Sequence, residues 1–440
     1  MTSRYFLGID VGTTNIKVVL YNDQLEMVQS AAVKTATPSQ RDEGLIEVNY
    51  LRHQVFSAIS QCMDAQNNSA VQAIGICGMA EAGCLLDDLD QPLTPVHLWY
   101  EDRSRLFANK IRRDLGSLVA SQCGLKVTHV RSLSKFAWLI ARTGYSTARW
   151  IGVPELVGLW LSGNYGTDAT LATRTGIYNV CSKKYSSEIL DYLHARQDQF
   201  PPVYSAPACI GSIQPDVGCK LGLNGDALIF IAGHDDIVAA YGVNAEPGDL
   251  VDSTGTAEGI IRVVDRLVHP GDLAKFGIAI APYFSERSYA LITGAGTTGA
   301  LIEVLAREIG LEFDVLDNNI SPPSSYHRND FRVKLSETRM PIILRNDLQD
   351  RPFELWSALY DVIAERFRRA ANKFLRFCDA PRRVIFIGGS AKSAELCRRK
   401  SSKLNLSFIR APEIDATTRG AAAVAGFAIG DQPRLWDQLV

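Results

Sequence analysis

A short polar turn near the start of the chain carries residue types that bind phosphate. It reads DVGTTN, from Asp10 to Asn15, and separates two apolar runs. Glycine lets a ligand approach the backbone, and exposed amides and hydroxyls can converge on phosphate oxygens. The acid at the start of the turn would repel bare phosphate, but it suits a Mg²⁺ ion placed between carboxylate and phosphates. The residues that we predict to meet the phosphates are Thr13, Thr14, Asn15 and Lys17.

Two common nucleotide-binding signatures do not explain this turn. The chain contains no GxxxxGK[ST] loop. It also lacks the GxGxxG fingerprint of dinucleotide-binding folds, and the turn leads into a second strand rather than a helix. Two interpretations are left, a hairpin that clamps phosphate and a plain β-hairpin that binds nothing.

The elements around the turn are predicted to alternate between strands and helices. Residues 4–35 have the pattern of strands, residues 50–66 that of a helix, and VQAIGICGM (71–79) that of a compact strand. The segment ALIFIAGHDDIVAAYGVN (227–244) is expected to form a buried strand, a polar break and a helix of small residues. Strands that alternate with helices predict α/β layers.

The second half of the chain repeats this order of elements. LVDSTGTAEGIIRVV (250–264) has the pattern of a strand, a Ser/Thr/Gly turn and a second strand. RRVIFIGGSAKSAELCRRKSSKL (382–404) has the pattern of a strand, a Gly-Gly-Ser turn and a helix. A polar junction with proline and glycine lies near residues 243–249. The pattern, though not the sequence, therefore indicates an internal duplication.

Composition places the chain among globular proteins. It has 440 residues, of which 46% are hydrophobic and 21% charged, and a net charge of −2. This balance gives no reason to expect binding to nucleic acid or to an acidic membrane surface. We expect no signal peptide, because no basic stretch precedes an apolar one at the N-terminus. The nine scattered cysteines show no CxxC spacing and favour a reduced, cytoplasmic protein.

Several segments together resemble the FGGY family of carbohydrate kinases, part of the actin/hexokinase superfamily. DVGTTNIKVVLYN (10–22), AGHDDIVAAYG (232–242) and VIFIGGSAKS (384–393) follow the family's order and approximate spacing. GICGMAEAGCLLDDLDQPLTPVHLWYEDRS (75–104), TDATLATRTGIYN (167–179), DSTGTAEG (252–259) and APEIDATTRGAAAVAGFAIG (411–430) resemble further family segments. The likeness extends over nearly the whole chain.

The resemblance implies an α/β fold with two RNase H-like, actin-like ATPase domains and a central cleft. The domains are expected at residues 1–243, with the sugar site and the catalytic base, and 244–440, with the ATP site. ATP and Mg²⁺ are the implied cofactors, and a small sugar or polyol is the implied partner. A homodimer is left open.

By motif position, Asp235 of the GHDD segment resembles the family's general base, which accepts the proton of the attacking hydroxyl. A helix cap is the alternative role for this residue and for its neighbour. Asp10 resembles the metal-associated acid. The residues that match the nucleotide turns are Gly255, Thr256, Gly388, Gly389 and Ser393.

Sugar contacts are implied at four further positions. Glu81 lies where family members present polar residues, and a carboxylate accepts hydrogen bonds from neighbouring hydroxyls. Trp99 is expected either on the carbon face of a sugar or in the core. Asp102 is expected near the sugar or in an ion pair with Arg103, and Asp236 beside the substrate or as a helix cap.

We therefore expect an ATP-dependent phosphotransferase that acts on a sugar or polyol hydroxyl. Two alternatives are a catalytically silent, FGGY-like regulator that binds sugar or nucleotide, and a non-kinase ATPase of the same superfamily. The chain is short for the family, and its GMAEAG turn (78–83) lacks the motifs of xylulose and glycerol kinases, so the sugar is not specified.

Overall fold

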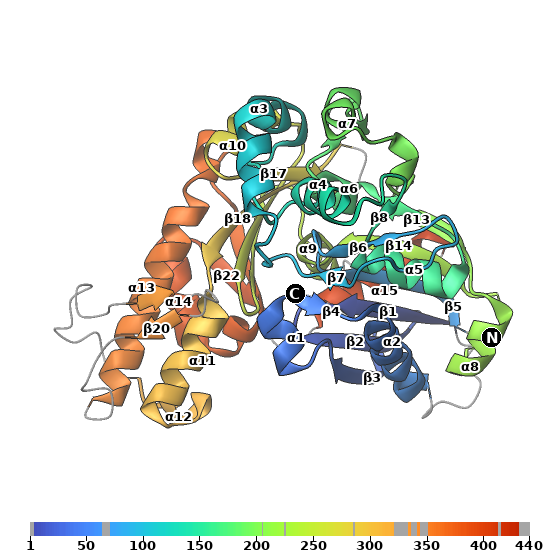
Figure 1. Ribbon diagram of the computed structural model, residues 1–440. Coiled ribbons are helices and arrows are strands. Elements are labelled where there is room, and N and C mark those ends of the chain that lie inside the picture. The colour runs from blue at the N-terminus through green and yellow to red at the C-terminus, as the bar shows by residue number, and fades with distance from the viewer. Residues whose placement is uncertain are drawn as a thin grey trace. The chain divides into compact units, whose positions relative to one another are not determined.

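The computed structural model divides the chain into two compact units (Figure 1). It describes residues 4–63, 71–204, 206–223, 226–284, 287–320, 333–335, 341–343, 351–411 and 415–430. The first unit comprises Met1–Asn244, Arg266–Ala290 and Ala416–Val440, and the second comprises Ala245–Asp265 and Leu291–Asp415. The first boundary lies one residue after the expected one. The two later segments of the first unit were expected in the second domain.

The first unit is built on a mixed sheet with the strand order β13-β14-β5-β1-β2-β3. The strands are β1 (Tyr5–Val11), β2 (Asn15–Asn22), β3 (Met27–Lys34), β5 (Val71–Gly78), β13 (Ala208–Ser212) and β14 (Leu228–His234). Strands β1, β5 and β14 run parallel, and β1 and β2 form an antiparallel hairpin. The predicted turn from Asp10 to Asn15 thus joins two neighbouring strands.

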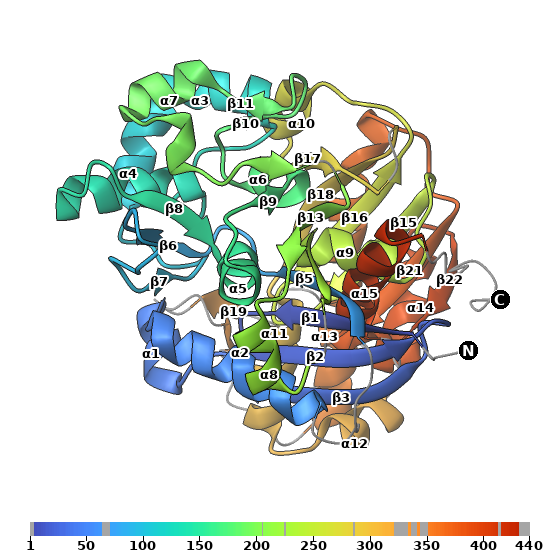
Figure 2. The same cartoon turned by 90° about the vertical axis from the view of Figure 1, so that its right-hand side faces the viewer.

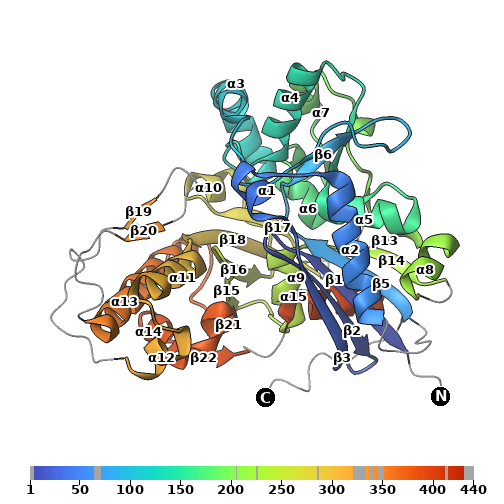
Figure 3. The ribbon, with the colours of Figure 1, turned by 60° about the horizontal axis from the view of Figure 1, so that its bottom comes forward.

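Alternating side chains of β1 face two different layers of helices. Leu7 and Ile9 belong to the core cluster that includes α2 (Val48–Met63) and α5 (Val153–Ser162), whereas Phe6 packs with α15 (Ala416–Ala428). Figure 3 shows the blue strands between α2 and α15. This burial on both faces explains why the sequence of β1 is a nearly continuous apolar run.

Two glycines let α15 lie unusually close to the first sheet. A Cβ atom added to Gly8 would lie 2.0 Å from the carbonyl oxygen of Thr418, and one added to Gly75 would lie 1.9 Å from that of Ala421. Any larger residue would therefore push the helix away from the strands. This close contact explains why the segment after residue 415 belongs to the first unit.

A smaller sheet and several helices complete the first unit. The smaller sheet has the order β4-β7-β6-β8, with β4 (Leu45–Ile46), β6 (Gly83–Leu86), β7 (Val96–His97) and β8 (Arg149–Gly152). The helices are α1 (Pro38–Glu43), α3 (Arg105–Cys123), α4 (Ser132–Thr143), α6 (Ala169–Arg174), α7 (Ser187–Leu193), α8 (Pro215–Leu221), α9 (Asp235–Gly242) and α10 (Pro270–Lys275). The short strands are β9 (Thr167–Asp168), β10 (Tyr178–Asn179), β11 (Lys184–Tyr185), β12 (Val203–Tyr204) and β17 (Ala279–Pro282). The helix expected at 50–66 begins two residues earlier as α2, and residues 64–66 lie outside the described part.

The second unit repeats the hairpin plan of the first. Strand β15 (Asp249–Thr254) forms an antiparallel hairpin with β16 (Glu258–Val264) and pairs in parallel with β21 (Arg383–Gly388). Its sheet continues to β18 (Tyr289–Gly296) on one side and β22 (Ser407–Arg410) on the other. Figure 2 shows β15, β21 and β22 side by side. The expected internal duplication is confirmed at the level of hairpin and parallel strand.

Helices of the second unit enclose their own core. They are α11 (Thr298–Ile309), α12 (Phe313–Asn318), α13 (Pro352–Ala371) and α14 (Ala394–Ser402). Trp356 and Tyr360 of α13 are fully buried among leucines of α11 and α14. A separate hairpin joins β19 (Val333–Leu335) to β20 (Pro341–Ile343). Among the described residues, no helix has the length and apolar character that crossing a bilayer requires.

Candidate active site

The carboxyl ends of β1, β5 and β14 bring the predicted acids of the first unit to one sheet edge. In the parallel register, Val11 pairs with Gly78, and Gly78 pairs with His234. The residues that follow these positions in the chain therefore leave the sheet at the same level. Polar groups at this edge of a parallel sheet commonly form ligand sites. The structure thus brings Asp10, Glu81 and Asp235 to one region.

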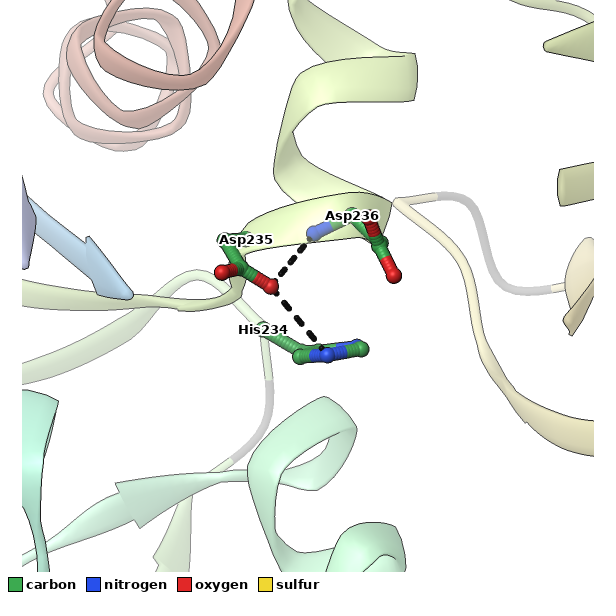
Figure 4. Close-up of side chains that lie close together, drawn as sticks. All are labelled: His234, Asp235 and Asp236. Carbon is green, nitrogen blue, oxygen red and sulfur yellow. Dashed lines mark hydrogen bonds and ion pairs between the residues drawn. The ribbon is translucent and has the colours of Figure 1, made fainter. Parts of the chain in front are cut away.

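Three consecutive polar side chains lie where strand β14 ends and helix α9 begins (Figure 4). The Nε2 atom of His234 lies 3.2 Å from Oδ1 of Asp235. The same carboxylate oxygen accepts a 2.8 Å hydrogen bond from the backbone N–H of Asp236. The side chain of Asp235 is 32% exposed, whereas that of His234 is 8% exposed. Asp235 thus keeps an accessible carboxylate although it starts a helix.

The electrostatic setting makes Asp235 a stronger base than an ordinary aspartate. Burial raises its pKa well above the usual value, and the negative charges of Asp236 and Asp10 raise it further, while Arg174 acts in the opposite direction. Burial also raises the pKa of Asp236. The pKa of His234 is well below its usual value because of burial and the positive charges of Arg174 and Arg131. Its imidazole is therefore neutral near pH 7.

The acids at this edge fit a hard divalent cation. Asp10 is 9% exposed and close enough to Asp235 to shift its pKa. One ligand atom each from His234, Asp235 and Asp236 also lies within 4.8 Å of the others. Carboxylate oxygens suit Mg²⁺, whereas imidazole suits transition metals. The donor set thus agrees with Mg²⁺ at the carboxylates, and the neutral histidine is better suited to orient Asp235.

Glu81 occupies a strained and highly charged position just after β5. Its φ of 65° lies in the left-handed region, which costs a residue with a side chain about 1 to 2 kcal/mol. Its Oε1 atom forms ion pairs with both Arg131, before α4, and Arg174, at the end of α6. Such backbone strain is often found at functional sites. The carboxylate that we expected to accept sugar hydroxyls is therefore already paired with two guanidinium groups.

Trp99 is connected to the hairpin that we predict to bind phosphate. Its indole Nε1 donates a 3.0 Å hydrogen bond to Oγ1 of Thr13. The buried ammonium of Lys135 holds the same segment by donating to the carbonyl oxygens of Trp99, His129 and Val130 at 3.2, 3.0 and 2.7 Å. Burial lowers the pKa of Lys135 to about 7. The contacts of Trp99 thus link the expected sugar segment to the expected phosphate turn.

The neighbouring acids differ from the sequence expectation. The side chain of Asp102 is 54% exposed and pairs with Arg105 rather than with Arg103. Arg103 instead pairs with Glu101 at 3.5 Å. Glu101 is 5% exposed and also lies 3.3 Å from His97. The Asp102–Arg103 ion pair was therefore wrong, and Glu101 is the buried acid of this segment.

The remaining hairpin residues of the first unit, Thr14, Asn15 and Lys17, are half-buried. Thr35 on the adjoining strand end braces their turn: its hydroxyl donates to the carbonyl oxygen of Gly12 at 2.7 Å and its N–H to that of Thr14 at 3.1 Å. With these carbonyls engaged, the turn is held in a fixed shape.

In the second unit, two exposed turns lie next to each other. Thr254 pairs with Gly388 in the parallel register, so the turn with Gly255 and Thr256 adjoins the turn with Gly388 and Gly389. Gly388 has a φ of 75°, which a glycine adopts without strain. Exposed turns without acidic side chains leave room for an anionic ligand against the backbone.

Ser393 lies in a different setting from the glycines before it. It is fully buried and caps α14, where its hydroxyl oxygen accepts a 3.1 Å hydrogen bond from the N–H of Leu396. The hydroxyl itself donates to Asp317 at 2.7 Å, and Tyr360 donates to the same carboxylate oxygen at 2.5 Å. These contacts fit a residue that positions the turn, and they leave its predicted contact with nucleotide untested.

Beneath the same turns lies a buried ionic trio. Lys400 of α14 donates to Asp252 at 2.6 Å and to Glu258 at 3.0 Å, and all three side chains have no exposed surface. Thr254 donates to the other carboxylate oxygen of Asp252, and Thr298 to that of Glu258. Burial raises the pKa of Asp252 to about 7, although Lys400 acts against this shift. The trio ties both strands of the hairpin to α14.

Sequence reasoning missed Arg131, Arg174 and Lys400. Arg174 lies within TDATLATRTGIYN, which was recognised as a family-like segment without a role for its arginine. Arg131 precedes α4, and Lys400 occurs in a basic run of α14, where a solvated face is the ordinary expectation. Of the three, only Arg174 carried a usable sequence signal.

The two hairpin-based sheets with turns at their carboxyl edges define a two-domain α/β protein of the actin/hexokinase type. Residues 5–242 match the family model for the N-terminal domain of the FGGY family of carbohydrate kinases. The chain belongs to this family, and the predicted fold class is confirmed.

Individual relatives agree with this assignment. The chain is 25% identical over 278 residues to a gluconokinase of Bacillus subtilis, a match over 60% of this chain and 53% of the relative. It thus spans about half the length of that relative. It is 24% identical to a xylulose kinase of Lactococcus lactis over 99% of this chain and 89% of the relative. The crystal structure of a gluconate kinase from Lactobacillus acidophilus superposes with a TM-score of 0.84 at 20% identity, covering 98% and 91% of the two chains.

Proposed function

We propose that this chain is an ATP-dependent carbohydrate kinase with Asp235 as its general base. The observation that carries the proposal is the accessible carboxylate of Asp235, which His234 and the N–H of Asp236 hold in place at the sheet edge that it shares with Asp10; its raised pKa agrees with this role. A base whose pKa lies closer to the working pH transfers protons more efficiently. The similarity to proteins named gluconokinase and xylulose kinase supports a small sugar or a related polyol as acceptor.

In the proposed reaction, Asp235 takes the proton of an acceptor hydroxyl as its oxygen attacks the γ-phosphorus of ATP. The new oxygen–phosphorus bond forms while the bond from that phosphorus to the β–γ bridging oxygen breaks, and ADP leaves with that oxygen. His234 holds the carboxylate from one side, and the N–H of Asp236 holds it from the other. Both contacts aim the free oxygen of Asp235.

Asp10 is the residue proposed to hold Mg²⁺, and this ion neutralises charge on the phosphates when bound. Hairpin residues of the first unit supply neutral donors for phosphate oxygens, and Lys17 supplies a cation. In the second unit, Gly255, Thr256, Gly388 and Gly389 offer backbone to the nucleotide, and Ser393 fixes the turn. Asp236 lies beside the base and is a candidate for contact with the acceptor.

Free thiols at all nine cysteines support a reducing compartment, and we propose the cytoplasm. All nine positions fall in the described part of the chain, and three of them are exposed. Exposed thiols persist where glutathione keeps them reduced.

A coupled assay of ADP release across ketopentoses, deoxyketohexoses, tetritols, glycerol and sugar acids tests the proposal. At least one acceptor should stimulate ADP release, and mass spectrometry should find a phosphate ester of that acceptor. ADP release that no acceptor stimulates would indicate a non-kinase ATPase. Absence of ATP binding by calorimetry would indicate a catalytically silent relative.

A further inference from the structure

A surplus of buried positive charge surrounds Glu81. Arg174 Nη2 lies 2.9 Å from Glu81 Oε1, and Arg131 Nη1 forms an ion pair with the same oxygen. The side chains are 7% exposed for Glu81, 15% for Arg131 and 13% for Arg174. One carboxylate therefore serves two guanidinium groups, which leaves one positive charge without an ion-pair partner in this cluster.

This surplus is energetically costly in the absence of another anion. Burial lowers the pKa of both arginines, and the charge of Arg174 lowers that of Arg131 further. Arginine nonetheless keeps its proton in proteins, so the cost is relieved by a second anion rather than by deprotonation. Asp235 and Asp236 attract Arg174 from a distance, but neither forms an ion pair with it among the described residues.

The donor groups that face this region are incompletely used. The Nε atom of Arg174 is buried and has no hydrogen-bond partner in the described part of the chain. Arg131 directs its Nε to the carbonyl oxygen of Lys126 at 3.3 Å, and its Nη1 to Glu81. Guanidinium groups bind carboxylates with two parallel hydrogen bonds, a geometry that neutral hydroxyls do not match.

We propose that the acceptor is a sugar acid whose carboxylate is bound by Arg131 and Arg174, while one of its hydroxyls faces Asp235. This inference rests on the proposed kinase function and names the substrate class. The carboxylate serves only for binding, and the phosphoryl group goes to a hydroxyl. Glu81 then has the role of holding both arginines in place, in its left-handed backbone conformation.

The competing interpretation gives the arginines a purely structural role. They would then only fasten the turn after β5 to the start of α4 and the end of α6. A structural role predicts that their loss lowers stability and weakens every ligand equally. A binding role predicts that their loss selectively weakens acids.

The test compares acceptors that differ only in the acidic group. Five- and six-carbon aldonates are assayed beside the alditols and ketoses of the same length, by ADP release and by calorimetric binding without ATP. The acids should bind and react with a kcat/KM on the order of 10 to 100 times higher, as two charge-assisted hydrogen bonds provide. A neutral sugar that reacts while every acid is inactive would overturn the inference.

Variants separate binding from structure. Arg131→Met should lower the affinity for acids on the order of 10- to 100-fold and leave that for neutral compounds unchanged, with partial rescue in Arg131→Lys. Glu81→Gln should strengthen acid binding, since it removes the competing carboxylate. Arg105→Gln, which removes an exposed ion pair, is the matched control and should change neither affinity.

The outcomes distinguish this inference from the proposed function. If an acid binds but no compound is phosphorylated, the kinase proposal fails and the substrate class is upheld. If no acid binds in calorimetry, the inference fails whether or not a neutral sugar is phosphorylated. If thermal unfolding shows that Arg131→Met does not fold, the comparison of acids with neutral compounds on the unaltered protein still decides whether the acceptor is a sugar acid.

Discussion

The two sheets of this protein follow one plan but place their charges oppositely. In the first unit, the edge at the end of β1, β5 and β14 carries Asp10 and Asp235, and the latter is one third exposed. In the second unit, Asp252 and Glu258 belong to the corresponding hairpin but have no exposed surface, and both pair with the buried Lys400. The exposed turns there contain no acid.

The difference fits the two chemical roles that we propose for the units, proton transfer in the first and phosphate binding in the second. An acid that takes a proton must reach the substrate, and its like-charged neighbours help by raising its pKa. A turn that binds phosphate gains from exposed amides and loses from nearby carboxylates, since like charges repel. The first unit therefore has the arrangement suited to proton transfer, and the second has that suited to holding an anion.

The largest expected effect is the loss of the proposed base in the first unit. Asp235→Asn keeps the shape of the side chain but cannot accept the proton. We expect kcat to fall on the order of 10²- to 10⁴-fold, while calorimetry shows nearly unchanged ATP binding. Near-full turnover in this variant would remove Asp235 from the mechanism.

The next effect concerns the buried charge of the second unit. Lys400→Met leaves two buried carboxylates without their cation, which should cost about 3 to 5 kcal/mol of stability. Scanning calorimetry measures it as a lower unfolding temperature. In a chain with two units, the second unit can unfold in a transition separate from that of the first.

A matched neutral variant sharpens this second test. Asp252→Asn, Glu258→Gln and Lys400→Met together remove all three charges but keep acceptors for Thr254 and Thr298. This triple variant should recover at least half of the lost stability, since neutral replacement of a buried ion network is commonly tolerated. A triple variant as unstable as the single one would show that shape, not charge, matters there.

Sequence reasoning found the parts of the molecule that depend on local pattern. The hairpin turn, the strand before Asp235 and the helix after it follow from apolar runs interrupted by polar residues. The placement of α15 on the first sheet did not follow, because it depends on glycines at Gly8 and Gly75 that match a helix over 340 residues away. Such contacts leave no periodic signal in either segment.

The site shows the same limit at the level of single side chains. Asp10 and Asp235 were identified through their segments, but Glu81 and its two arginines lie at three different elements: after β5, before α4 and at the end of α6. Asp102 and Glu101 are neighbours in the chain, and sequence alone did not reveal which of them points inward. The backbone conformation after β7 decides this, and that conformation depends on contacts such as the one between Glu101 and His97.

A smaller effect is expected where Trp99 links the predicted sugar segment to the predicted phosphate turn. Trp99→Phe removes the N–H that binds Thr13 but keeps an aromatic ring. Loss of one such hydrogen bond is worth about 0.5 to 1.5 kcal/mol, so we expect a two- to tenfold rise in KM for ATP, roughly. Asp102→Ala, in the same segment but on the surface, is the control and should change little. A rise in KM for the acceptor alone would instead indicate that the indole N–H contacts the acceptor.

The smallest expected effect is a shift of the pH profile. A general base must be unprotonated, so with Asp235 in the proposed role kcat/KM should rise with pH through a pKa above the ordinary value of about 3.9. Because Asp236 raises that pKa, Asp236→Asn should move the acidic limb to lower pH, by up to about one unit. Arg174→Met should move it the other way, since the arginine lowers the pKa of Asp235. Because Asp235 and Asp236 interact, the apparent pKa of the acidic limb describes the pair and not Asp235 alone. If both variants shift the limb in the same direction, the charges around Asp235 do not control its proton, and the contrast between the two units loses its electrostatic basis.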